Sequence, residues 1–446
     1  MLLAAAAAAG FFLVHPEMAP QSLDRLIEDV SGGNPHPVAL VRPSVQPLSA
    51  LALLGEKIFH DPSLSASGRQ SCASCHDPAR SYGPPNDRDV QLGGPRLVSE
   101  GLRPPPSLAY LYRQGPFAIG PVAEEMDDLI PLDQLAQQAQ QTTRATKSAA
   151  VAPAAGQMVP SGGLFWDGRT DTFMDQASGP LMNPAEMANK NRGEVAAKLA
   201  RASYAQDFKP LFGDHILDSP AMLFAEAMSA LSRFQVEEAS FHRFDSKYDH
   251  WLEGKARLDR AEMRGLRLFN DPTKGNCAAC HLSQPTKDGL PPLFTDTEYE
   301  ALGVPRNRRL AVNRDPNFFD KGLCGPLRAD LAGQTQYCGM FLTPTLRNTA
   351  RRGVYFHNGF YHDLKQVLDF YNLRDVQPAR IYPHDATGRV HKYDDLPARD
   401  HTNIDVADAP FDRKPGDRPV LTDAEIRDII AFIKTLDDGD DGKHAY

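Results

Sequence analysis

The chain has 446 residues, enough for two or three domains that each have a hydrophobic core. Charged residues make up 24% of the sequence and apolar residues 41%, which are ordinary values for a soluble globular protein. The net charge of −9 and the isoelectric point near 5.9 argue against nucleic acid or an anionic membrane as a partner.

The chain begins with an apolar, uncharged segment at residues 1–14 (MLLAAAAAAGFFLV) that is too short to span a bilayer comfortably. This segment resembles the hydrophobic region of an export signal that lacks its positive flank. Prolines recur without a period between residues 15 and 48 and indicate an extended lead-in. We therefore expect residues 1–30 to be an export or anchor-like segment with its lead-in.

The pattern Cys-x-x-Cys-His occurs twice, at residues 72–76 and 277–281. It is the attachment signature of c-type haem, because two thiols at this spacing can form thioethers and the adjacent imidazole can reach the iron. A redox dithiol does not need the histidine, and a zinc site needs two more ligands. The sequence therefore predicts two covalent haem c groups. Their expected binding residues are Cys72, Cys75, His76, Cys277, Cys280 and His281.

Similar segments precede the two haem motifs, at residues 55–62 and 265–272. Each predicts a helix that carries an aromatic residue into the core and ends before an Asp-Pro pair. Two similar units at this distance indicate two similar domains rather than a solenoid. We expect a mainly α fold of two cytochrome c-like helical domains, at 31–250 and 251–446, each with one covalent haem c. An Ala/Gln/Thr-rich insertion at about 121–156 interrupts the first domain.

Two further helices have clear start signals. A Ser-Pro pair at 219–220 begins the first, and a capping box at 422–425 begins the second. Strand signals are nearly absent, so both domains are expected to be mostly helical. The residues expected to face the core are Leu223, Ala227, Ala230 and Phe234 in the first helix, and Ile426, Ile429, Ile430 and Ile433 in the second.

Additional motifs lie between and after the haem motifs. The first group is Leu-Phe-Trp-Asp-Gly-Arg at 164–169, then Gln176, Gly-Pro at 179–180 and Pro-Ala-Glu-Met at 184–187. The second group is Thr-Pro-Thr-Leu-Arg-Asn at 343–348 and Tyr-Phe-His-Asn-Gly at 355–359. In these motifs the sequence resembles the bacterial dihaem cytochrome c peroxidase family, which includes the MauG-type enzymes. The resemblance extends from about residue 50 to the C-terminus. It implies a periplasmic enzyme with a peroxidatic first haem and an electron-transfer second haem.

The resemblance also implies catalytic residues. Trp166 is similar to a tryptophan that lies between the haems and passes electrons or holes, and Glu186 to a glutamate beside the peroxidatic haem. Gln176 and Pro180 resemble neighbours in that pocket. Breaking an O–O bond heterolytically requires a proton to move from one peroxide oxygen to the other, which a carboxylate can do. Without the motif, the indole would be interpreted as a core residue and the carboxylate as a solvated surface charge.

The loop after the first haem motif lacks a histidine. Many members of the family have one there, and it must leave before peroxide can bind. This chain has no histidine between His76 and Trp166, and Met126 and Met158 lie beside the insertion. The first haem is therefore expected to be open at rest, as in MauG-type enzymes and constitutively active peroxidases.

The second haem is expected to have Tyr371 as its other ligand. This residue ends the helical series 364, 367, 368, 371 after the Tyr-Phe-His motif. Most dihaem peroxidases have Met at this position, whereas the MauG type has Tyr. An oxygen ligand should lower the haem potential relative to His/Met ligation. In the alternative, Tyr371 is a core residue and Met340 is the ligand.

Three positions depart from the family pattern. Gly275 stands where the MauG type has a surface tryptophan, and Trp251 is more simply explained by packing. Pro104 and Arg352 stand at or near the calcium ligands of the family. Because a cationic side chain could replace the charge of calcium, these residues put calcium in doubt.

The remaining cysteines, Cys324 and Cys338, suit an oxidising compartment and are expected to form a disulfide. A disulfide that closes a loop of this length contributes about 3 kcal/mol in the chain-entropy interpretation. The alternative is a pair of buried free thiols.

These inferences favour a dihaem peroxidase that reduces hydrogen peroxide to water with electrons from a small periplasmic cytochrome c or cupredoxin. The alternative is a MauG-like oxidase that modifies side chains of a partner protein through a high-valent iron state. A plain electron carrier is disfavoured by the open first haem and Glu186.

Overall fold

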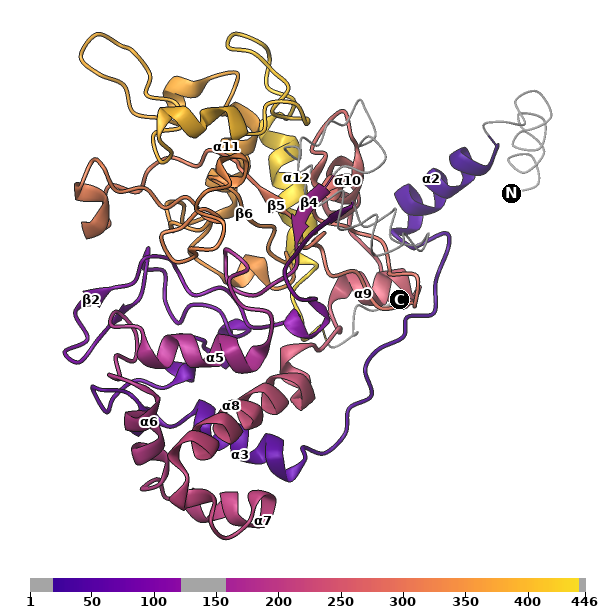
Figure 1. The fold of residues 1–446 in the computed structure, drawn as a ribbon. Helices are drawn as coiled ribbons and strands as arrows, with labels where there is room; N and C mark the ends of the chain where they lie inside the picture. Colours follow the sequence, from indigo (N-terminus) through magenta and orange to yellow (C-terminus); the bar gives the residue numbers. More distant parts are fainter. Residues whose placement is uncertain (1–18, 122–157, 441–446) are drawn as a thin grey trace.

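The computed structural model describes residues 19–121 and 158–440 (Figure 1). The apolar segment at 1–14 and all but the first residue of the predicted insertion lie outside the described residues. Within the described ranges, helices are the main regular structure, and the strands form three short antiparallel pairs. A helix-rich fold is therefore confirmed. In the same ranges, no helix is both long and apolar enough to cross a membrane.

The helices and strands occupy the following positions. The helices are α2 (Ala19–Ser31), α3 (Ala50–Phe59), α5 (Phe173–Met182), α6 (Arg192–Leu199), α7 (Lys209–Phe212), α8 (Pro220–Glu237), α9 (Lys247–Leu252), α10 (Arg260–Asn270), α11 (Leu364–Leu373) and α12 (Asp423–Lys434). The paired strands are β1 (Leu92–Gly93) with β2 (Ser99–Glu100), β3 (Ala118–Pro121) with β4 (Met158–Ser161), and β5 (Tyr299–Glu300) with β6 (Phe341–Leu342).

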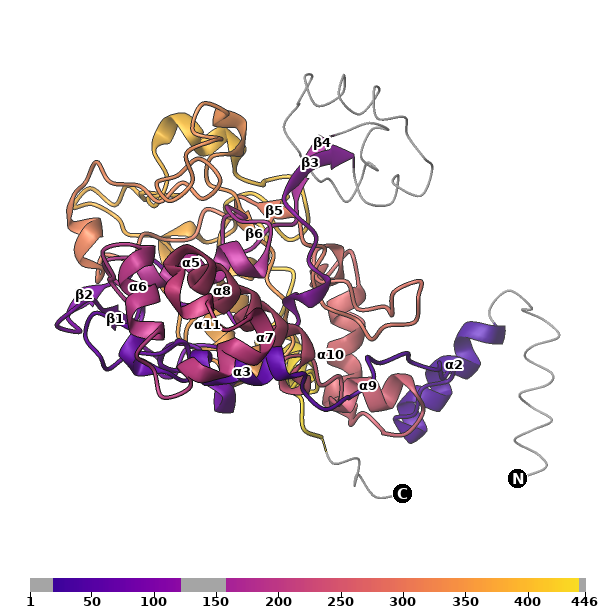
Figure 2. The same cartoon turned by 60° about the horizontal axis from the view of Figure 1, so that its bottom comes forward.

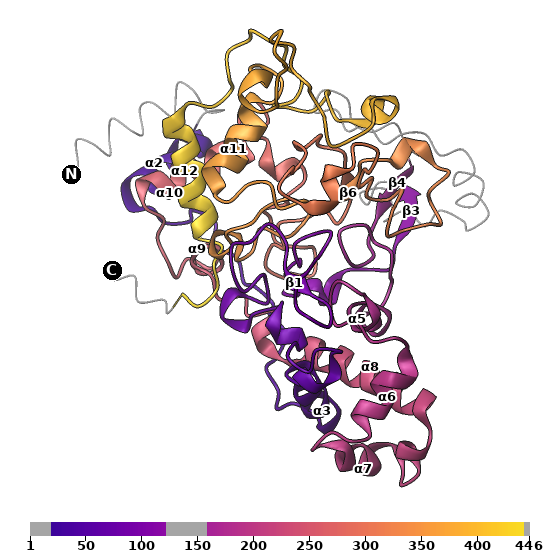
Figure 3. The ribbon, with the colours of Figure 1, turned by 90° about the vertical axis from the view of Figure 1, so that its left-hand side faces the viewer.

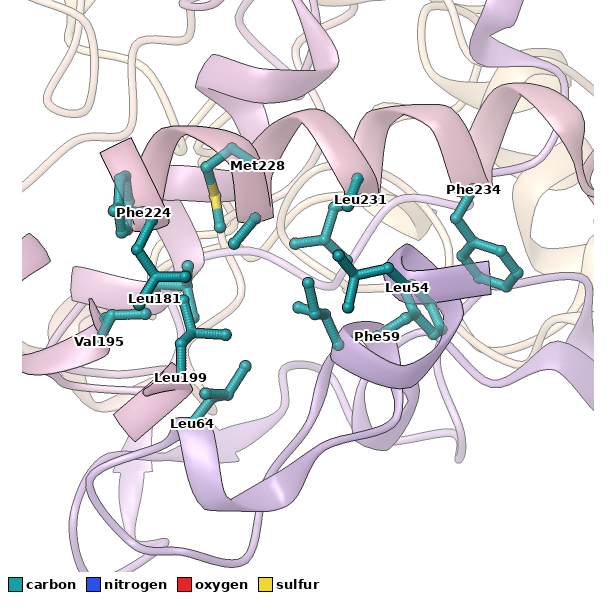
Figure 4. Close-up of a cluster of buried hydrophobic side chains, with 14 of the residues drawn as sticks. Leu54, Phe59, Leu64, Leu181, Val195, Leu199, Phe224, Met228, Leu231 and Phe234 are labelled. Atoms are coloured by element: carbon teal, nitrogen blue, oxygen red, sulfur yellow. The ribbon is translucent and has the colours of Figure 1, made fainter. Parts of the chain in front are cut away.

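The first hydrophobic core surrounds α8, the longest of the described helices. As predicted, α8 begins after Ser219 and buries the face that carries Leu223, Ala227, Ala230 and Phe234. Helices α3, α5 and α6 pack against it. In Figure 4, Leu54 of α3 and Leu199 of α6 lie on the side of α8 from which Leu231 projects. Burying this apolar surface is the main stabilising contribution of this half of the molecule.

The second hydrophobic core surrounds α12. The predicted capping box is present, because Thr422 accepts from the Glu425 N–H and the Glu425 carboxylate accepts from the Thr422 N–H. Ile426, Ile429 and Ile433 are buried against α10 and α11, whereas Ile430 is partly exposed. Figures 1 and 3 show α10, α11 and α12 grouped at one end of the molecule and α3, α6, α7 and α8 at the other.

The predicted repeat appears as two equivalent helix crossings. Gly55 of α3 faces the Ala230 carbonyl of α8 so closely that an added Cβ would overlap this oxygen. Gly265 of α10 faces the Asp428 carbonyl of α12 in the same way. Each of the two helices then buries a phenylalanine, Phe59 or Phe269, before the chain enters its haem motif. A glycine at each crossing lets the two backbones approach one another closely.

The extended lead-in lies along the second half of the molecule. The Val38 N–H donates to the Leu252 carbonyl at 2.9 Å, and Arg42 binds both carboxylate oxygens of Glu253. Figures 1 and 2 both show α2 beside α9 and α10. The sequence placed this stretch in the first domain, 31–250, because an extended, proline-containing segment has no apolar periodicity to indicate the core it joins. The domain boundary near residue 250 stays a prediction.

The region between α10 and α11 is mostly irregular and includes a disulfide. Cys324 and Cys338 are bonded with their Cα atoms 5.0 Å apart, which confirms the predicted pairing. Met340 is buried beside them, in a cluster that also contains Tyr299 and Leu323. This cluster stabilises a stretch that consists of short helical turns and loops.

Candidate functional site

The first haem motif folds into a tight turn that presents its histidine. Residues Cys72–Ser74 form a 3₁₀ turn, and the His76 N–H donates to the Cys72 carbonyl at 2.9 Å. His76 Nδ1 lies 3.1 Å from the Tyr82 carbonyl, which can only accept, and the tautomer with the proton on Nδ1 makes this hydrogen bond. Burial lowers the pKa of His76 to about 4. The imidazole is therefore neutral at pH 7, with its lone pair on Nε2, as iron ligation requires.

The second motif repeats this geometry. Residues Cys277–Ala279 form a 3₁₀ turn, and the His281 N–H donates to the Cys277 carbonyl at 2.9 Å. His281 Nδ1 lies 2.9 Å from the Phe294 carbonyl, which again places the ring proton on Nδ1. The two motifs thus present their histidines with the same hydrogen bond to a backbone carbonyl.

A cavity of about 220 Å³ lies beside the second motif. The side chains of Cys277, Cys280, His281 and Tyr371 line one part of it, and Trp166 lines another. Much of the remaining wall is apolar. Two thiols, an imidazole and an apolar wall around one space fit a flat, apolar cofactor that is attached through sulfur and ligated through iron. The apolar lining residues include Phe269, Leu346, Val354, Val367, Leu368, Leu421 and Ile433.

Tyr371 lies in α11, and its ring stacks on Phe411 with the ring centroids 5.4 Å apart. Burial raises the pKa of its hydroxyl, and the nearby Cys280 and Cys277 thiols raise it further. The phenol is therefore neutral in the absence of a metal. The alternative ligand, Met340, packs in the disulfide cluster and does not line this cavity. Of the two candidates, only Tyr371 shares a cavity with His281.

Glu186 lies in a turn that folds back on α5. The Met187 N–H donates to the Pro180 carbonyl inside the helix at 3.1 Å, and Asn183 Nδ2 donates to Glu186 Oε1 at 2.6 Å. Burial raises the pKa of Glu186, while the charge of Arg169 and the Asn183 hydrogen bond oppose the rise. A carboxyl group whose pKa is raised by burial holds a proton more readily than an exposed glutamate and can still release it.

The Glu186 carboxyl group is close to the first haem motif. The pKa of the free Cys75 thiol rises to about 11, mainly through burial and further through the charge of Glu186. The strand pair β1–β2 closes this turn from outside, because the Gly94 N–H donates to the Glu186 carbonyl at 2.7 Å. An added Cβ at Gly93 would overlap the Ala185 carbonyl, so this position requires glycine.

Trp166 lies between the cavity and the first half of the chain. Its indole Nε1 donates to the Pro104 carbonyl at 3.0 Å, and its ring lines both the large cavity and a second one of about 50 Å³. The next residue, Asp167, is fully buried and pairs with Arg103 at 2.9 Å and Arg169 at 2.7 Å. These contacts fix the segment that carries the indole.

Arg103 connects this segment to the second half of the chain. Besides Asp167, it binds Asp320, with Nε–Oδ2 and Nη2–Oδ1 distances of 2.7 and 2.8 Å. Asp320 lines the large cavity together with His357, whose ring stacks on that of Phe341 with the ring centroids 3.6 Å apart. Sequence reasoning did not identify Arg103 or Asp320, because a single charged residue in a loop has no local signal of its distant partner.

The other predicted residues have different surroundings. Gln176 is buried on α5, in the helix that precedes the Glu186 turn. Trp251 stacks on Tyr248 in the second core, as the packing interpretation expected. At Gly275, an added Cβ would lie 2.5 Å from the Leu268 carbonyl, so this backbone leaves no room for a side chain. Met158 is buried in β4, and Met126 lies outside the described residues.

The Arg103 contacts predict a large effect on stability. Arg103→Met would leave the buried Asp167 and Asp320 carboxylates without their common cation, a change that costs about 3–5 kcal/mol. The matched control, Arg113→Met, removes a solvent-screened pair whose side chains are 46% and 55% exposed, and should have little effect on stability. Denaturant unfolding of both variants measures the difference. Equal stability of the two variants would contradict this account.

Comparisons with known proteins identify the relatives of the chain. The sequence model of a family described as di-haem cytochrome c peroxidase matches residues 49–257. The methylamine utilization protein MauG of Paracoccus denitrificans is 31% identical over 398 residues, which are 87% of this chain and 89% of that protein. Cytochrome c551 peroxidase of Nitrosomonas europaea is 28% identical over 357 residues, 78% of this chain and 81% of that protein.

A solved structure has a similar fold. The diheme peroxidase BthA from Burkholderia thailandensis is 34% identical and aligns with a TM-score of 0.71, covering 90% of this chain and 89% of that one. The relatives include proteins named MauG and proteins named cytochrome c peroxidase, so the comparisons do not choose between these two activities. The chain belongs to the dihaem cytochrome c peroxidase family, which includes the MauG proteins.

Proposed function

We propose that this protein is a dihaem c-type peroxidase that reduces hydrogen peroxide to water with electrons from a small periplasmic redox protein. The observation that carries the proposal is Glu186, a carboxyl group with a raised pKa beside the first haem motif. Each peroxide molecule would take up two electrons and two protons and yield two water molecules. Membership of a family that contains cytochrome c peroxidases supports this reaction class.

The two sites have the residues that covalent haem c needs. In each half, two thiols would form thioethers and the histidine Nε2 would bind iron. At the second site, the Tyr371 phenol would be the other ligand, because it shares the cavity with His281. Bound haem would supply the redox equivalents that peroxide reduction consumes. The residues proposed to hold the two haems are Cys72, Cys75, His76, Cys277, Cys280, His281 and Tyr371.

Glu186 would move the proton. Its Oε1 atom accepts from Asn183, which leaves Oε2 to exchange a proton with the substrate. In this proposal, Oε2 takes a proton from one peroxide oxygen and returns it to the other, so that water leaves as the O–O bond breaks. Gln176 would be a polar neighbour on α5, and Trp166 would connect the two sites, since it lines the cavity wall between the halves.

The absence of a histidine between His76 and Trp166 supports a first site that is open to peroxide. A protein ligand in this loop would have to be displaced before substrate could enter. The oxidised protein would therefore react without prior reduction.

A MauG-like oxidation of a partner protein is the second candidate. It is favoured by the 31% identity to MauG of Paracoccus denitrificans and by a tyrosine at position 371. Gly275 speaks against it, because the backbone there has no room for the tryptophan that would carry electrons from a docked protein to the haems. For either activity we propose a periplasmic location, since covalent haem c and the disulfide both suit that compartment.

Turnover with candidate electron donors tests the proposal. The purified protein should contain two covalently attached haems, and reduced small cytochrome or cupredoxin should be oxidised when peroxide is added. Mixing with peroxide first and with donor second should oxidise two one-electron donors per peroxide. The MauG-like activity is correct instead if such donors do not reduce the peroxide-oxidised state of the protein. In that case, this state should be reduced only when one particular periplasmic protein is added, and the mass of that protein should change.

Glu186→Gln should slow the reaction with peroxide by roughly 10²–10⁴-fold, because the amide cannot take up the proton. The wild-type rate should rise with pH through a pKa above the ordinary glutamate value of about 4.3, since only the deprotonated carboxylate accepts a proton. This pH dependence should be lost in the variant. Stopped-flow mixing at several pH values measures both effects. The control Glu56→Gln, at an exposed position on α3, should behave like wild type. An unchanged rate in Glu186→Gln would remove this residue from the mechanism.

Tyr371→Phe should change the absorption spectrum of the second haem from a six-coordinate towards a high-spin form, because the phenyl ring offers no ligand atom. The matched control is Tyr361→Phe, which alters a buried tyrosine in the same aromatic cluster. This control should leave the spectrum unchanged. Identical spectra in both variants would make Tyr371 a packing residue.

A further inference from the structure

Arg352 lies where the two cavities meet. It follows the short 3₁₀ turn Thr349–Arg351, and its side chain extends towards Gly83 of the first half, where an added Cβ would be 3.7 Å from Arg352 Nε. It lines the large cavity and also the smaller one. The residues that line both cavities are Pro106, Trp166, Leu342, Thr343, Pro344 and Arg352, and Arg352 is the charged member of this set.

The described residues neutralise little of the positive charge of Arg352. Its Nη2 reaches the Arg347 carbonyl only at 3.5 Å, and its buried Nε has no hydrogen-bond partner. The nearby Tyr355 hydroxyl donates to the backbone carbonyl of Arg352 rather than accepting from the guanidinium. Burial lowers the pKa of Arg352 to about 10, a shift that Tyr355 and Asp437 only partly oppose. A buried cation in this condition is costly unless an anion binds it.

The buried arginines in the described ranges each have a carboxylate partner. Arg103 binds Asp167 and Asp320, Arg347 binds Asp249, and Arg374 binds Asp375. No carboxylate within the described ranges forms an ion pair with Arg352, and Asp437 lies near Arg351 instead. Arg352 therefore differs from them by facing a cavity instead of an acidic side chain.

The wall of the large cavity has more acidic than basic side chains. Among the described residues, Arg352 is the one lysine or arginine side chain in its wall. The acidic side chains of this wall are Glu300, Asp320, Asp395, Asp405 and Asp408. An anionic group that enters the cavity would be repelled by several carboxylates, and a guanidinium is available to bind it at one place.

We propose that the Arg352 guanidinium binds the carboxylate edge of the cofactor held in the large cavity, that is, a propionate group of the second haem. This inference rests on the proposed function only in that it requires haem at this site. The Nε and Nη groups of arginine match a carboxylate in a two-hydrogen-bond geometry. The fixed positive charge would also stabilise the reduced, more negative state of the second haem relative to the oxidised state. The reduction potential of the second haem would therefore depend on this charge, which lies in the same cavity wall as Trp166.

Redox titration of the holoprotein tests this assignment. Arg352→Met and Arg352→Gln should lower the midpoint potential of the second haem by at least a tenfold change in the reduction equilibrium, about 59 mV for one electron. Arg352→Lys keeps the charge and should remain close to wild type. The control Arg380→Met, at an exposed site, should have no effect. The vibrational bands of the haem propionates should change in the Met and Gln variants and much less in the Lys variant.

Two results would overturn the assignment. One is an unchanged potential in Arg352→Met and Arg352→Gln with both haems still attached. The other is an Arg352→Lys variant whose potential falls as far as that of Arg352→Met, since the charge would then not be the cause. Neither measurement uses peroxide, so a failure of the proposed peroxidase activity would leave this result standing, and the reverse holds as well.

Discussion

The structure depends on one buried guanidinium, that of Arg103, at the contact between its two halves. This side chain binds Asp167 beside the indole of Trp166 and also binds Asp320 in the wall of the large cavity. A buried cation between two carboxylates is stable only when both partners stay in place, because each charge has lost its hydration. The contact therefore fixes the distance between the segment from the first half and the cavity of the second half. Trp166 keeps its position between the sites for this reason.

A second set of buried polar contacts reinforces the same boundary. Arg347 is fully buried and pairs with Asp249, and the rings of Tyr110 and Phe244 lie 4.9 and 4.7 Å from its guanidinium carbon. The Tyr110 hydroxyl donates to Asp438 Oδ1 at 2.5 Å, so a residue of the first half is hydrogen-bonded to a residue that follows α12. Cation–π contacts of this kind are strongest when water is excluded, as it is here. The two halves thus share a polar core in addition to their separate apolar ones.

Local signals in the sequence predicted much of this molecule. The haem motifs, the similar helix before each of them and the start of α12 depend on residues that are close in sequence, so spacing and capping rules reveal them. The pairing of Arg103 with Asp320 joins residues 217 apart, and neither residue carries a sign of the other. The lead-in packs on the second half through backbone hydrogen bonds and the ion pair of Arg42 with Glu253, and neither contact leaves a periodic pattern in the sequence. Tyr371 was predicted as a ligand because helical spacing and family resemblance agreed, whereas the sequence did not show that Arg352 faces a cavity.

The matching hydrogen bonds of His76 and His281 have a chemical consequence. Each imidazole donates Nδ1–H to a neutral backbone carbonyl, Tyr82 or Phe294, rather than to a carboxylate. A carbonyl acceptor gives the imidazole less anionic character than a carboxylate would, and both histidines have an acceptor of this kind. In the proposed dihaem enzyme, these Nδ1 partners would therefore give the two irons no reason to differ. Any division of labour between them must come from the opposite faces and from the charges around the rings. Selection for a new activity in such a duplicated framework would act on those faces, while the turn that holds each histidine stays unchanged.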